Sequence, residues 1–243
     1  MLPIALLTLN GQVRGRRLIL VGLLLATPAL LALAYRGSER HPDGALFSVQ
    51  MIDNLVLPLL IPLTALLLAS TALGGEVEDR TLLYLTLRPV PRLSIAIGKL
   101  LAVSLITVAL TEVSVLLMYL IAAAGSGESR VLVAGLVAGL VGPVAYCSLF
   151  LPLGLLAPRR GLIVGLIYVL VWEATAAGIS AVFATLSVRR YVLGAIDATL
   201  DSARLINMDR ATVGGLASIL VLVAVVAAAI GFTTWWIRRM EIP

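Results

Sequence analysis

The sequence predicts an all-α integral membrane protein with six membrane-spanning helices and one domain, residues 1–243. Of its residues, 60% are hydrophobic and only 13% are charged, about half the charged share of an average soluble domain. The mean hydropathy of +1.08 excludes an ordinary soluble domain. Six apolar runs each approach the ~20 residues that a helix needs to cross the hydrocarbon. They are residues 18–34, 54–73, 100–124, 131–156, 161–183 and 212–236.

The arginines and lysines predict how these spans are oriented. With an even number of spans, both termini lie on the same side, and 11 of the 18 Lys and Arg residues fall on that side. The positive-inside rule therefore places the termini and residues 74–99 in the cytoplasm. The formal charge of +5 could indicate a nucleic-acid partner, but the arginines cluster between apolar spans. Lipid headgroups are therefore the expected anionic neighbours, and no nucleic-acid partner is expected.

Before the first span, residues 1–17 predict a helix lying in the membrane interface. Apolar positions among residues 2–13 repeat at helical spacing, with polar side chains between them. Three arginines at positions 14, 16 and 17 then precede the apolar run. A positive segment before an apolar run is also typical of a cleaved signal peptide, which is the alternative interpretation.

Residues 74–99 form the long polar-flanked interruption around which the chain is organised. Glu76, Glu78 and Asp79 precede a short apolar run, residues 82–87, and the Arg88-Pro89 pair closes it. Acidic residues favour the positive end of a helix, and proline ends one, so a helix of roughly two to three turns is predicted. Such a helix is too short to span a bilayer and too apolar to lie bare in water. We expect it to fill a groove on another protein.

This loop resembles the first cytoplasmic loop of ABC-2-type transporter permeases. The resemblance is carried by Glu76, Glu78, Arg80, Thr81 and Leu82, then Arg88-Pro89-Val90-Pro91-Arg92, then Gly98-Lys99. It implies a short cytoplasmic coupling helix that contacts a separate ATP-binding cassette subunit. The contact residues so implied are Glu76, Glu78, Asp79, Arg80, Thr81, Leu82, Leu83, Leu85 and Arg88. In family members the residue before this threonine is often a glycine, whereas here Arg80 precedes Thr81. The turn into the helix is therefore expected to differ.

The resemblance also implies the assembly and its cellular place. Two copies, or this chain and a similar permease, would pair with two ATP-binding subunits that hold ATP and Mg. Export across a bacterial inner membrane is the implied function. From the residues alone, two other functions stay open: an ATP-independent secondary transporter or channel, and a mechanical relay to an outer partner that moves no solute. The substrate is left open.

The last loop, residues 184–211, predicts an outer amphipathic helix. Val192, Ile196, Leu200 and Ala203 fall at helical spacing among charged residues. ABC-2 permeases have similar outer helices before the last span, which adds to the resemblance. The alternative interpretation is a surface helix without a function. At the C-terminus, tryptophans 235 and 236 and arginines 238 and 239 predict an interfacial anchor.

Glu112 and Glu173 are the acidic residues deep inside apolar runs. A carboxylate at mid-membrane costs about 2.5 kcal/mol or more, so each is expected to face protein or water. They are candidates for a translocation path. Alternatively, each is structural, bonded to a neighbouring helix, or Glu112 meets its counterpart across a dimer axis.

Prolines and glycines predict how individual spans bend and pack. Pro58 and Pro62 should bend the second span, and Pro143 and Pro152 the fourth, either as hinges or as static shape. Gly135, Gly139 and Gly142 give the fourth span a small-residue face for close packing, within the chain or between subunits.

The chain carries no recognisable catalytic or metal-binding motif. It lacks a G-x-x-x-x-G-K-[ST] phosphate loop, so ATP hydrolysis and its cofactors are expected in a partner, and this chain is expected not to be an enzyme. With Cys147 and His41 each alone of their kind, a zinc site is not expected.

Overall fold

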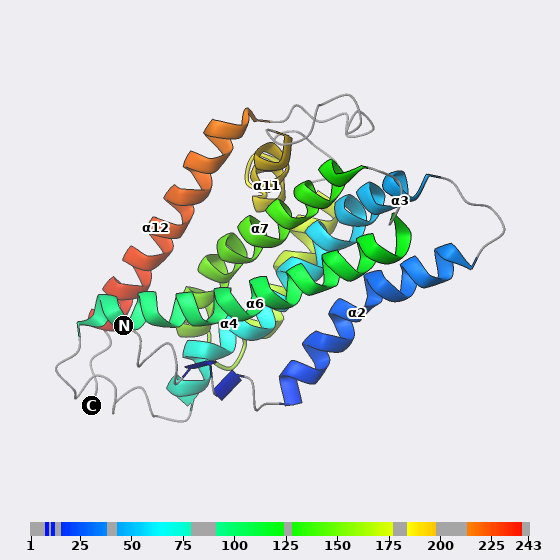
Figure 1. The fold of residues 1–243 in the computed structure, drawn as a ribbon. Helices are drawn as coiled ribbons and strands as arrows, with labels where there is room; N and C mark the ends of the chain where they lie inside the picture. The colour runs from blue at the N-terminus through cyan, green and yellow to red at the C-terminus, as the bar shows by residue number, and fades with distance from the viewer. Residues whose placement is uncertain are drawn as a thin grey trace.

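The structure, a computed structural model, describes residues 8–9, 11–12, 16–37, 43–78, 91–123, 128–176, 184–197 and 213–239. Within these residues every element is a helix, and the helices form the bundle in Figure 1. The all-α fold class is confirmed. Apolar side chains cover much of the outside, especially on the flanking helices, as expected for a surface that faces lipid.

Five helices are long and apolar enough to cross a membrane. They are Leu18–Arg36 within α2 (Arg16–Arg36), Gly44–Glu78, α6 (Arg92–Ala122), α7 (Ser129–Leu156) and α12 (Gly215–Arg239). Five of the six predicted spans are thereby confirmed as helices of sufficient length. The remaining one is described in two parts, α8 (Gly161–Ile167) and the π-helix η2 (Tyr168–Ala176). Its apolar helix covers Gly161–Thr175, and residues 177–183 lie outside the described part of the chain.

The second span is longer than its apolar run. It consists of α3 (Gly44–Met51), the π-helix η1 (Ile52–Leu60) and α4 (Ile61–Glu78), which follow one another without a break. Asp43 begins it by accepting a hydrogen bond from the Ala45 backbone N–H at 3.0 Å, a helix-capping contact. Pro58 lies inside η1, where the wider turn accommodates a residue that cannot donate a backbone hydrogen bond.

The helix Gly44–Glu78 is the centre of the bundle. In its most apolar stretch, 72% of the residues are buried, against 22% for α2 and 11% for α12. Its α4 part packs on α7 and α6, and α2 packs on α6. Figure 1 shows α2 and α12 on opposite flanks of α4, α6 and α7. The core is therefore made by the second, third and fourth spans.

Glycines on α7 allow the helices inside the chain to approach closely. Gly135 faces Val115 and Ile52, and Gly142 faces Ile61. The small-residue face predicted on the fourth span thus packs within the chain at these positions. α7 continues as one helix through both of its prolines.

The predicted outer helix corresponds to α11 (Val188–Asp197). Val192 and Ile196 of the predicted apolar face are buried, whereas positions 200 and 203 lie outside the described residues. Near the N-terminus only residues 8–9 and 11–12 are described, all helical. There Gln12 Nε2 donates to the Leu68 carbonyl oxygen at 3.3 Å. The rest of the predicted interfacial helix lies outside the described part.

Candidate functional site

One end of the bundle, which we call the basic end, consists of residues 76–78, 91–99, 156–161 and 234–239. Here α4 ends and α6 begins, on either side of residues 79–90, which lie outside the described part of the chain. Seven of the predicted contact residues fall within residues 79–90. They are Asp79, Arg80, Thr81, Leu82, Leu83, Leu85 and Arg88. Their role stays a prediction.

The prediction for Glu76 and Glu78 as the first turn of a short helix is wrong. Both belong to the last turn of α4. The spanning helix continues through Gly74 and Gly75 although a glycine pair is a turn signal, and Gly74 packs against the backbone of Gly154 on α7. Glu76 also has a cationic partner, which offsets the unfavourable interaction of an acidic side chain with the negative end of a helix.

That partner is Lys99 on α6. Its side chain is only 1% exposed, and its ammonium group lies 2.5 Å from Glu76 Oε1. The same ammonium group donates to the Ala72 carbonyl oxygen at 2.6 Å, which lies in the last two turns of α4. Because the pair is removed from water, breaking it would leave a buried charge. Lys99 therefore ties the end of α4 to the beginning of α6.

A glycine pair ties α4 to α7 at the same end. A Cβ on Gly154 would collide with the Ser70 carbonyl oxygen, and one on Gly74 would lie 3.1 Å from the Gly154 carbonyl oxygen. The two backbones are in contact there, which only glycine permits. The ends of α4, α6 and α7 are thus held together as one unit.

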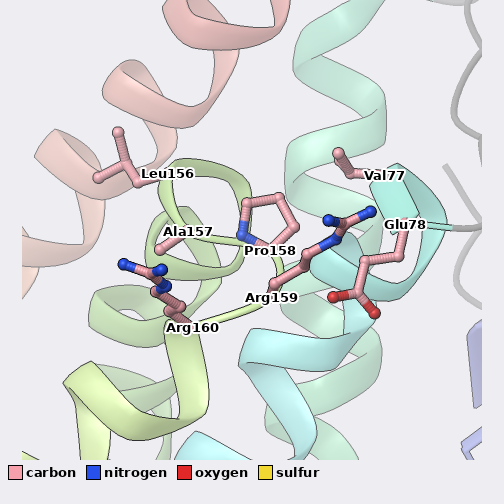
Figure 2. A pocket seen from close by; sticks show the side chains of 7 residues that line it. All are labelled: Val77, Glu78, Leu156, Ala157, Pro158, Arg159 and Arg160. Atoms are coloured by element: carbon pink, nitrogen blue, oxygen red, sulfur yellow. The ribbon is translucent and has the colours of Figure 1, made fainter.

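A pocket of about 510 Å³ opens beside this unit. Figure 2 shows it between the end of α4 and the turn that joins α7 to α8. Its lining includes both apolar and charged side chains, and Arg159 extends toward Glu78 while Arg160 points away. Its lining residues are Val77, Glu78, Leu156, Ala157, Pro158, Arg159 and Arg160. The sequence analysis used Arg159 and Arg160 only to orient the spans. Their position in the loop after the fourth span was the signal that could have indicated a pocket at this end.

Toward the opposite end, Glu173 is fully buried and has three donors. The Tyr168 and Ser187 hydroxyls donate to it at 2.8 and 2.6 Å, and the Val188 backbone N–H donates at 3.0 Å. Because Val188 is the first residue of α11, the carboxylate caps that helix. Of the alternatives for Glu173, these contacts favour the structural one.

A second carboxylate also attaches to α11. Asp53 on η1 forms an ion pair with Arg189, so α11 is bound to both π-helices, which contact one another. Sequence reasoning did not single out either residue. The signal was weak, since Asp53 lies one position before an apolar run and Arg189 in a loop of mixed charge.

Glu112 has a different environment. It is half-buried on α6, and its Oε1 lies 2.9 Å from the position that a Cβ on Gly139 of α7 would take. Among the described residues it has no hydrogen bond or ion pair. The structure does not bring Glu112 and Glu173 together into one site.

Taken together, five helices able to span a bilayer and a tightly packed helical core define a multi-pass membrane protein. The family model described as ABC-2 family transporter protein matches residues 16–188, more than half of the chain. The protein therefore belongs to the ABC-2 family and is a membrane-spanning permease subunit of an ABC transporter. No curated protein matches the chain.

Proposed function

We propose that the protein is the permease of an ATP-driven exporter, and that a separate ATP-binding subunit docks on the basic end. The pocket between α4 and the α7–α8 turn carries this proposal. Its lining includes Glu78, which residues 79–90, resembling a coupling helix, follow in the chain, and it combines apolar with charged side chains. Interfaces between proteins commonly combine an apolar centre with a polar rim.

The contacts between helices at the basic end explain how a displacement of this surface would be transmitted to the spans. Lys99 links α4 to α6, and the Gly74–Gly154 contact links α4 to α7. A displacement of the loop would therefore move three spans together. We expect closure of two ATP-binding subunits to tilt this unit in each of two permease copies, or in this chain and a similar one.

The proposed setting is a bacterial inner membrane with both termini and the basic end in the cytoplasm. The arginine distribution supports this orientation, since Arg92, Arg159, Arg160, Arg238 and Arg239 all lie at the basic end. Export as the direction rests on the family resemblance.

Co-purification from native membranes tests the docking surface. Wild-type protein should retain an ATP-binding subunit, and Glu78→Lys or Arg159→Glu should lose it, because each reverses a charge in the pocket lining. Arg130→Glu is the matched control, since Arg130 is exposed at the opposite end of the bundle, and it should retain the subunit.

Two results would count against this proposal. If wild-type protein captures no ATP-binding subunit in mild detergent, the ATP-independent transporter becomes the better explanation. If both pocket variants retain the subunit, docking takes place elsewhere on the chain.

A further inference from the structure

Away from the basic end, three carboxylates lie inside the described helices that form the spans, and two of them are satisfied. Asp53 pairs with Arg189, and Glu173 accepts three hydrogen bonds. Glu112 has no such partner among the described residues. Its side chain is half-buried and therefore remains accessible from outside the chain.

Glu112 lies in an apolar part of α6. It lies about 18 Å along α6 from Leu100 and about 15 Å from Ala122, at 1.5 Å per residue, so it is near the middle of the apolar part of this span. Nearby in sequence, Val113 and Leu116 on α6, and Leu140 next to Gly139 on α7, are exposed apolar side chains. Gly139 gives the carboxylate room against α7.

An ionised carboxylate in such a place requires a counter-charge. At mid-membrane its cost is about 2.5 kcal/mol or more without one. Lys99 lies about 20 Å away along the same helix and already pairs with Glu76. Arg189 already pairs with Asp53. The described residues therefore supply no cation for Glu112.

We propose that Glu112 binds the charged group of a lipophilic organic cation, whose apolar groups contact the exposed side chains of α6 and α7. Such a molecule matches the site because it brings both a positive charge and apolar surface. A metal ion does not match it, since a single carboxylate among aliphatic side chains offers too few oxygen ligands. This inference rests on the proposed export function, because it names the class of molecule exported.

Binding to the purified full-length protein in phosphatidylcholine nanodiscs tests the proposal without any ATP-binding subunit. The probe is tetraphenylphosphonium, and tetraphenylborate is the control of the same shape and opposite charge. Wild-type protein should bind the cation saturably and in preference to the anion. Glu112→Gln should weaken cation binding at least 10-fold, whereas Glu112→Asp, which keeps the charge, should retain most of it.

The matched control is Glu128→Gln, which removes a carboxylate immediately before the first residue of α7 and should leave cation binding unchanged. Equal affinity of wild type and Glu112→Gln overturns the proposal, as does wild type that binds both probes equally. If wild type binds no cation and Glu112→Gln changes the fraction of dimer, Glu112 instead meets a second copy, which also overturns it. Because no ATP-binding subunit is involved, failure here is distinguishable from failure of docking.

Discussion

Glu112 and Glu173 lie in similar apolar runs, but the protein surrounds them in opposite ways. Glu173 is fully buried, and its oxygens accept three hydrogen bonds, two of which, from Ser187 and Val188, fix the beginning of α11. Glu112 is half-buried, with no partner among the described residues. A charge inside a membrane span can thus be structural or available to a ligand, and its partners rather than its hydropathy distinguish the two.

Removing Glu173 should have the largest effect on stability. In Glu173→Leu, the Ser187 hydroxyl, the Val188 N–H and the Tyr168 hydroxyl lose their acceptor. Buried donors left unpaired cost about 1–3 kcal/mol each, so we expect a loss of about 3 kcal/mol or more. A thiol-reactive dye can report unfolding, because Cys147 is the one cysteine and is fully buried. If Glu173→Leu unfolds no earlier than Glu112→Leu, the contrast between the two residues fails.

Breaking the Lys99–Glu76 pair should have the next largest effect on stability. It tests how much stability is lost when a carboxylate loses its cationic partner. Lys99→Met leaves Glu76 charged and poorly solvated, which should cost about 3 kcal/mol. The double variant Lys99→Met/Glu76→Met should regain most of that loss, because no charge stays behind. The same dye measurement on wild type, Lys99→Met, Glu76→Met and the double variant gives the coupling energy between the two side chains. Additive losses would mean that the two side chains do not stabilise one another.

Glu112→Gln should have the smallest effect. No hydrogen bond or ion pair among the described residues is lost, so any loss of stability should be no more than about 0.5 kcal/mol, and removing an unpaired carboxylate from mid-membrane acts in the stabilising direction. Thermal unfolding with the same dye checks this. A loss as large as that of Glu173→Leu would mean that Glu112 is structural too, contrary to the comparison.

Much of the fold could be predicted from the sequence, since hydropathy identifies apolar helices well. Span ends were harder. α4 continues to Glu78 and α6 begins at Arg92, because the charges at positions 76 and 99 neutralise one another across two helices. Periodicity within one helix contains no information on such a pair.

The environment of the two glutamates could not be predicted for a similar reason. Ser187 and Val188 are 14 and 15 residues from Glu173, so their contact depends on how the chain turns between η2 and α11. The Gly74–Gly154 contact joins residues 80 positions apart. The identity of the residues was visible in the sequence, but their pairing requires tertiary structure.

The continuous helix Gly44–Glu78 has 35 residues and is therefore about 52 Å long. A hydrocarbon layer about 30 Å thick could contain all of it only at a tilt of roughly 55°, beyond the range of up to about 40° seen for membrane helices. Part of this helix therefore stands outside the hydrocarbon. Thicker or thinner bilayers would change how much of it emerges, so lipid chain length should modulate the presentation of the pocket at Val77 and Glu78.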